Sequence, residues 1–116
     1  MEHDTYLFER LDVWQAASQA LVAVVGLRER LRLPGDMRSQ IERALASCVA
    51  NIAEGVGRES SADRKRHFAI ARGSATEAGG LIEVAWILKS LTDAERAQLR
   101  SLLQRTSWML TAMIRR

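Results

Sequence analysis

The stretch from Asn51 to Glu77, NIAEGVGRESSADRKRHFAIARGSATE, decides how the rest of this chain is interpreted. An apolar run that carries an asparagine and a glutamate ends in two glycines, and a basic segment leads into a second run. A phosphate-binding loop would place such glycines between a strand and a helix. Here Gly55 and Gly57 close a run of helical periodicity, so we interpret the stretch as two helices joined by a turn.

The chain on either side has a helical pattern as well. Apolar residues recur every three or four positions along four segments, which places them on one face of a helix. Runs of β-branched residues bounded by turn signals are missing, and the single proline, Pro34, lies between the first two segments. The sequence therefore predicts an all-α fold, an antiparallel up-down four-helix bundle. It forms one domain, 1–116, with helices at about 7–31, 37–57, 61–90 and 93–114.

Capping residues precede three of these helices. Asp36 is placed to cap the second helix, and Ser60 or Ser61 is placed to cap the third. Thr92 and Glu95 have the spacing of a capping box at the start of the fourth.

Composition limits the classes of protein that fit. A chain of 116 residues with 47% hydrophobic content can bury its own core. The single cysteine, Cys48, lies on the apolar stripe of the second helix, so we expect a buried thiol and a reducing compartment. The apolar run 20–27 is too short to span a bilayer, and the opening MEHDTYLFER is unlike a secretory signal. We expect a cytoplasmic protein with no membrane segment.

Catalytic and metal-binding patterns have little support. A di-iron bundle needs a glutamate three positions before a histidine, and neither His3 nor His67 has one. Glu54 and Glu77 would lie too far apart along the hairpin to share a metal or a proton. We expect His67 on the hairpin surface, and a non-enzymatic protein with no catalytic residues, metal or cofactor; an enzyme using Asn51 and Glu54 is an alternative.

Two features exceed the needs of a minimal bundle. Glycines 73, 79 and 80 lie inside the third helix, where each costs about 1 kcal/mol relative to alanine, so we expect a close backbone approach to offset them. The run ALVAVVGL in the first helix is apolar in nearly all directions, and the last helix adds Trp108 beside its core stripe. Such helices pack on two sides, which predicts a homo-oligomer; a wider intramolecular core is the alternative.

Two polar groups remain to be explained. Asn51, Glu54 and Arg58 share one helical face, and we interpret them as a polar link that ties the hairpin together. Between positions 58 and 72 there are five basic residues and two acidic ones. Phosphate binding needs such clustering, and basic side chains at a helix start oppose its dipole, although a solvated helix start is the alternative. The candidate nucleic-acid-binding residues are Arg58, Arg64, Lys65, Arg66 and Arg72.

The runs SCVANIAEGVGRES and HFAIARGSATE, with FERLDVWQAA before them, resemble the four-helix bundle proteins encoded in the intervening sequences of bacterial 23S rRNA genes. The resemblance covers roughly Phe8 to Leu110. It implies a bundle that forms a homopentamer and has no established enzymatic activity. A distant likeness is to the accessory variability protein of diversity-generating retroelements, a basic pentameric bundle that associates with a reverse transcriptase and nucleic acid. The motif residues, with a structural role, are Asn51, Glu54, Gly55, Gly57, Arg58, Gly73, Ser74 and Glu77.

One departure from the family pattern concerns the third helix, where Ala75 and then Ala78-Gly79-Gly80 replace larger apolar residues. The resemblance therefore leaves the packing distance of this helix open. The first hypothesis is an oligomeric protein that associates with RNA or DNA through the basic hairpin. The second is a scaffold that docks a protein partner through its apolar faces, without binding nucleic acid.

Overall fold

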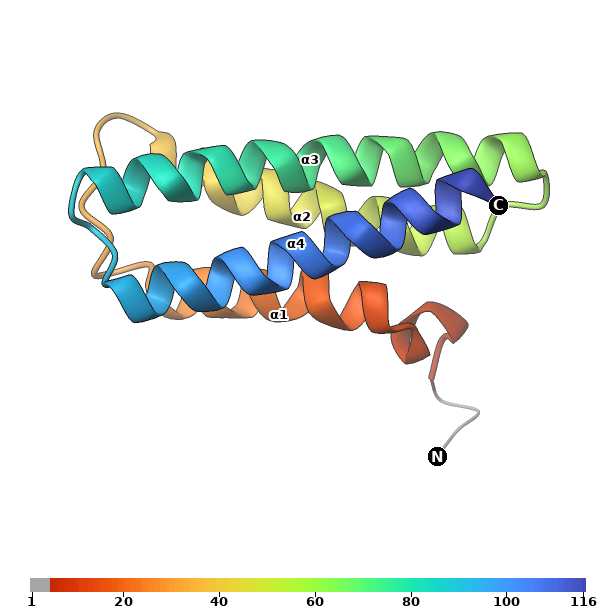
Figure 1. The fold of residues 1–116 in the computed structure, drawn as a ribbon, viewed down its shortest axis with the longest axis horizontal. Coiled ribbons are helices and arrows are strands. Elements are labelled where there is room, and N and C mark those ends of the chain that lie inside the picture. Colours follow the sequence, from red (N-terminus) through yellow and green to blue (C-terminus); the bar gives the residue numbers. More distant parts are fainter. Residues whose placement is uncertain (1–4) are drawn as a thin grey trace.

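The computed structural model describes residues 5–116, so His3 lies outside the described residues. A short 3₁₀ helix, Leu7–Arg10, precedes four α-helices: α1 (Asp12–Gly26), α2 (Met37–Val56), α3 (Ser61–Ile87) and α4 (Asp93–Arg115). Figure 1 shows successive helices running in opposite directions, joined by short connections at alternate ends of the bundle. The predicted all-α four-helix bundle is confirmed.

The first helix is shorter than the expected range 7–31. Leu11 has an extended backbone, with φ −82° and ψ 133°, and it separates the 3₁₀ helix from α1. At the other end α1 stops at Gly26, the least helix-favouring residue of the run. The third helix also ends early, at Ile87, because Lys89 adopts a left-handed φ of 65°, a conformation that stops helices.

The helix starts agree with two of the three predicted caps. Ser60 Oγ accepts the backbone N–H of Asp63 at 3.1 Å, and Thr92 and Glu95 form the complete capping box. The prediction for Asp36 is wrong in its chemistry. Asp36 occupies the position before α2, but its carboxylate accepts the side-chain amide of Gln40 at 2.8 Å rather than a backbone N–H.

The core consists of one apolar stripe from each helix, as the periodicity predicted. Its largest fully buried side chains are Val24, Ile41, Leu45, Cys48, Ile52, Leu99, Thr106 and Leu110. Burial raises the pKa of the Cys48 thiol to about 12. The thiol therefore stays protonated at neutral pH, which suits a packing role rather than a nucleophilic one.

Two connections meet at one end of the bundle. The backbone N–H of Arg32, between α1 and α2, donates to Ser90 Oγ at 3.1 Å, and that hydroxyl donates to the Arg32 carbonyl at 2.6 Å. Arg28 forms a two-fold hydrogen bond with Glu42 near this end, and Arg30 pairs with Glu95. The two halves of the chain are thus joined through both backbone and side chains.

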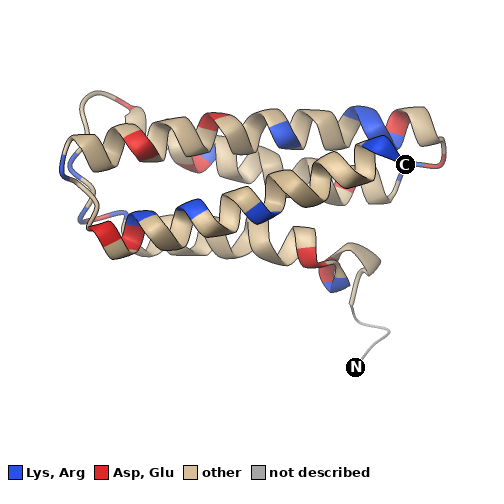
Figure 2. Cartoon of the chain, viewed as in Figure 1, with Lys and Arg blue, Asp and Glu red and all other residues tan. Residues whose placement is uncertain are grey.

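Charged residues are distributed along α2, α3 and α4, whereas α1 carries a single one, Asp12 at its start (Figure 2). Within residues 5–116, no helix combines the length and the hydropathy that crossing a bilayer would require.

Candidate functional site

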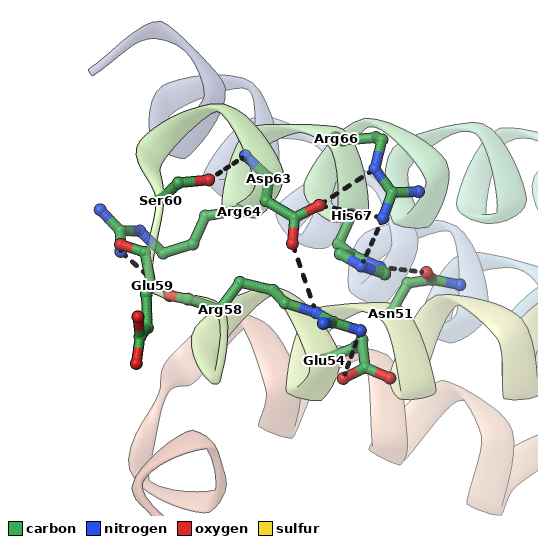
Figure 3. A network of polar contacts seen from close by, with 9 residues as sticks. All are labelled: Asn51, Glu54, Arg58, Glu59, Ser60, Asp63, Arg64, Arg66 and His67. Atoms are coloured by element: carbon green, nitrogen blue, oxygen red, sulfur yellow. Dashed lines mark hydrogen bonds and ion pairs between the residues drawn. The ribbon is translucent and has the colours of Figure 1, made fainter.

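A chain of hydrogen bonds connects α2 to α3 along their shared seam. Ser47 Oγ and Ser74 Oγ lie 2.9 Å apart. The Asn51 amide Nδ2 donates to the Ser47 carbonyl at 2.9 Å. Figure 3 shows the other side of the same amide, where Asn51 Oδ1 lies 3.0 Å from His67 Nδ1. Asn51 is half-buried and bridges the two helices, so the geometry is that of the polar link expected from the sequence.

His67 is buried, with 8% of its surface exposed, so the expectation of a surface histidine is wrong. Because the Asn51 amide nitrogen is directed to Ser47, its oxygen accepts from the ring, which assigns the hydrogen to Nδ1. Nε2 then accepts from the Arg66 guanidinium at 3.1 Å. Both ring nitrogens have partners, which is how a polar ring is accommodated at this depth.

The chain of contacts continues outward through alternating charges (Figure 3). Arg66 donates to Asp63 Oδ1 at 3.0 Å, and Arg58 Nε lies 3.5 Å from the other Asp63 oxygen. Arg58 also pairs with Glu54 at 3.3 Å, which confirms the predicted i, i+4 ion pair. Hydrogen bonding from Arg66, with the charge of Arg58 nearby, holds the pKa of Asp63 below its usual range. Arg58 and Arg66 therefore already have carboxylate partners.

Gly55 explains how the two helices come close enough for these contacts. A Cβ at this position would lie 2.6 Å from Phe68 Cε1 and 3.2 Å from His67 Cβ. No side chain fits there unless the Phe68 ring moves. Gly57 is different, because a Cβ there would meet only backbone oxygens, the nearest at 3.6 Å. Of the two motif glycines, Gly55 is the one that the packing requires.

The predicted nucleic-acid-binding residues take part in different contacts within the chain. Arg58 and Arg66 belong to the polar chain just described. Arg64 donates to the carbonyls of Arg58 at 3.0 Å and Glu59 at 2.6 Å, so it holds the turn between α2 and α3. Arg72 donates to Thr111 Oγ1 at 3.2 Å and fastens α3 to α4. The sequence could not separate these roles, because they depend on which helix each side chain faces.

Arg64 and Lys65 also line a cavity of about 280 Å³ at the junction of α3 and α4, together with Arg116. We call it the basic hollow; its other lining residues are Ser61, Phe68 and Met113. Arg116 was missed at the level of sequence. The available signal was the pair Arg115-Arg116 after a helix that runs antiparallel to the third, which brings the end of one beside the start of the other.

A second cavity, of about 370 Å³, lies between α3 and α4 and is here called the α3–α4 groove. Ala75, Gly79 and Gly80 line it from α3, and Leu103 and the exposed Trp108 line it from α4. The expected close approach at the α3 glycines is wrong within this chain. A Cβ at position 73, 79 or 80 would meet nothing within 4 Å.

The same groove carries a cluster of charge on its lining. Glu83 accepts from Arg96 at 2.7 Å and also pairs with Arg100. These guanidinium groups, Arg96 first, hold the pKa of Glu83 below its usual range. Within the described residues no group of three or more histidine, cysteine or acidic side chains is arranged to hold a metal ion.

Four antiparallel helices, with motif residues that join the central hairpin, define a four-helix bundle protein. The family of 23S rRNA-intervening sequence proteins matches residues 9–112, and the chain belongs to that family. A solved structure from Bacteroides thetaiotaomicron, a protein with unknown function from the S23 ribosomal protein family, has the same fold. It is 23% identical to this chain, with a TM-score of 0.81 over 90% of this chain and 99% of the other. None of the curated proteins compared with the chain matches it.

Proposed function

We propose that this protein is a non-enzymatic, homo-oligomeric four-helix bundle of the cytoplasm, which binds the phosphate backbone of RNA or DNA through its basic hollow. The observation that carries the proposal is the convergence on one cavity of Lys65, from α3, and Arg116, which directly follows α4. Arg64 lines the same cavity while it holds the turn between α2 and α3, so its position is fixed. Guanidinium and ammonium groups held around a recess are suited to phosphate oxygens.

Assembly would give this small site its affinity. A single basic hollow offers few phosphate contacts, but several copies in one particle raise the effective concentration of each. Support for assembly comes from large apolar side chains that remain exposed, which are Leu7, Val22, Val25, Ile70, Val84, Ile87, Leu88 and Trp108. Ile70, Val84 and Ile87 lie along one side of α3, and exposed apolar side chains that are grouped in this way mark an interaction surface. We propose a pentamer, following the family resemblance.

A salt titration tests the proposed binding. A fluorescent RNA hairpin and a duplex DNA of equal length are titrated at several salt concentrations, with the particle mass recorded in parallel. The variant Lys65→Glu/Arg116→Glu is expected to bind at least about tenfold more weakly, with a shallower dependence of affinity on salt. The matched control, Lys89→Glu/Arg105→Glu, makes the same charge change outside the basic hollow. Equal weakening of both variants, or no binding by the natural chain at low salt, rejects the proposal.

The second candidate function is a protein-interaction scaffold. It is favoured by the α3–α4 groove, which is mainly apolar, has glycines on one side and has an exposed tryptophan on the other. A partner captured by the protein in cell extract would then survive nuclease treatment and high salt. Loss of the partner under either condition would favour the nucleic-acid function instead.

A further inference from the structure

The side of α3 that faces away from the core carries a second regular stripe. Its members follow one another at spacings of three and four, and they are Ile70, Gly73, Glu77, Gly80, Val84 and Ile87. All six are exposed, and the core stripe of Ala71, Ala75, Ala78 and Ile82 lies on the opposite side of the helix. We call this stripe the outer face of α3. A helix with an apolar stripe on each side is expected to pack on both.

Three features of this face are unexplained by the single chain. Gly73 and Gly80 each weaken the helix, yet a Cβ at either position would meet open space. Val84 and Ile87 are exposed, the latter to 66%. Glu77 lies between the two glycines, and within residues 5–116 its carboxylate has no hydrogen bond or ion pair. The face therefore fits a second helix that approaches closely at the glycines and carries a cation opposite Glu77.

The outer face of α2 has the complementary character. Its residues, again at spacings of three and four, are Ser39, Arg43, Ala46, Ala50, Ala53 and Gly57. Apart from Arg43 every side chain is small, so the face could pack closely against bulky neighbours. The Arg43 guanidinium lies 3.6 Å from Asp36, with both side chains about two-thirds exposed, which is a weak contact that a better partner would displace.

Arg43 and Glu77 also lie at the same level along the hairpin. Ser47 contacts Ser74 across the seam, so these two serines lie at the same level. Arg43 lies about one helical turn before Ser47, and Glu77 lies about one turn after Ser74. Because the two helices are antiparallel, both steps run in the same direction along the hairpin. Rotation about an axis parallel to the hairpin leaves the height of every residue along that axis unchanged, whatever the number of subunits. Turning one copy about such an axis therefore keeps its Arg43 level with Glu77 of its neighbour.

We propose that the outer face of α3 is the docking surface for the outer face of α2 in a second copy of this chain, with Arg43 of that copy paired to Glu77. The inference rests on the homo-oligomer of the proposed function and names its contact. A nucleic acid fits this surface poorly, because its phosphates would meet the Glu77 carboxylate. Ala46 and Ala50 of the second copy lie level with Gly73 and Ile70, where the glycine leaves room for them.

A charge exchange tests the pairing, with particle mass measured across a concentration series by light scattering and sedimentation. Glu77→Arg and Arg43→Glu are each expected to weaken association at least about a hundredfold, because like charges then face each other at an interface. The double variant restores the opposite charges and is expected to recover the mass of the natural chain. Glu29→Arg and Arg105→Glu are matched controls at exposed positions outside both faces, and they should leave the mass unchanged.

A steric variant gives an independent readout. Gly73→Leu should preserve helicity, since a Cβ at this position meets nothing within 4 Å and Gly73 does not line the α3–α4 groove, but it should reduce the mass to that of a monomer. The inference is overturned if the natural chain is oligomeric while the single variants keep its mass, or if the helical double variant fails to recover it. A monomeric natural chain overturns this inference together with the proposed oligomer. Nucleic-acid binding is tested separately, at Lys65 and Arg116.

Discussion

The third helix packs against α2 along one seam and against α4 along another, and glycines have opposite effects on packing at the two seams. At the α2–α3 seam, Gly55 lets the helices meet so closely that even a methyl group would collide with Phe68. At the α3–α4 seam, Gly79 and Gly80 leave a groove of about 370 Å³. The comparison teaches that a helical glycine marks close packing only where a neighbouring side chain occupies the space that its Cβ would fill; elsewhere it leaves that space open.

Replacing Gly55 by alanine should produce the largest change. We expect the free energy of unfolding to fall by about 2 to 3 kcal/mol, because the added carbon forces the Phe68 ring out of a packed position. Urea denaturation followed by circular dichroism measures the effect. Gly57→Ala is the matched control, and it should change stability by less than about 1 kcal/mol. A Gly55→Ala protein as stable as the natural one would show that the seam can open without loss.

Removal of the Asn51 side chain should cause the second-largest loss of stability. Asn51→Ala leaves the buried His67 Nδ1–H without its acceptor, so stability should fall by about 1 to 2 kcal/mol. A double-mutant cycle with His67→Phe measures the coupling between the two positions. If the two losses simply add, the Asn51 to His67 hydrogen bond contributes nothing of its own.

At the α3–α4 seam a glycine-to-alanine substitution should raise stability rather than lower it. Gly79→Ala adds a methyl group where no atom lies within 4 Å, and it improves the helix propensity of α3. We expect a gain of up to about 1 kcal/mol in the same urea assay. A loss of stability would mean that α3 and α4 lie closer in solution than the groove implies.

The smallest effects should be those of the charged residues. Asp63 at one seam and Glu83 at the other have pKa values lowered by arginines. A carboxyl group whose pKa is lower in the folded state stabilises the protein above its unfolded pKa, and this contribution is lost as the pH falls through the folded pKa. Asp63→Asn and Glu83→Gln should therefore each flatten the fall in stability between about pH 5 and pH 2. Thermal unfolding across that range measures this slope, and unchanged curves would show that these half-buried ion pairs contribute nothing to stability.

The sequence predicted the fold because helix formation here depends on local patterns. Periodic apolar residues located all four helices, and the Thr92 and Glu95 capping box located the start of α4 within one residue. The errors in the helix bounds occur where the backbone leaves the helical conformation without any change in the apolar periodicity. Leu11 interrupts the first predicted helix through an extended backbone that periodicity does not report.

The candidate site was predicted in its residue types but not in its grouping. Periodicity placed Asn51, Glu54 and Arg58 on one face, but it could not show that His67 would be buried against them. That burial depends on Gly55, because a side chain at this position would collide with α3 and keep it further from α2. Arg116 joins Lys65 only because α4 ends where α3 begins, a proximity set by tertiary structure and invisible in local sequence.

The hydroxyl of Ser90, which both accepts from and donates to the Arg32 backbone, bears on how the native state opens. It joins the connection between α1 and α2 to the connection between α3 and α4, so neither hairpin can swing away at that end while the bridge holds. Local opening by hinge motion should therefore start at the opposite end, where the basic hollow lies. Amide hydrogen exchange would then be slowest at the Ser90 end and fastest at the end where the proposed phosphate-binding residues lie.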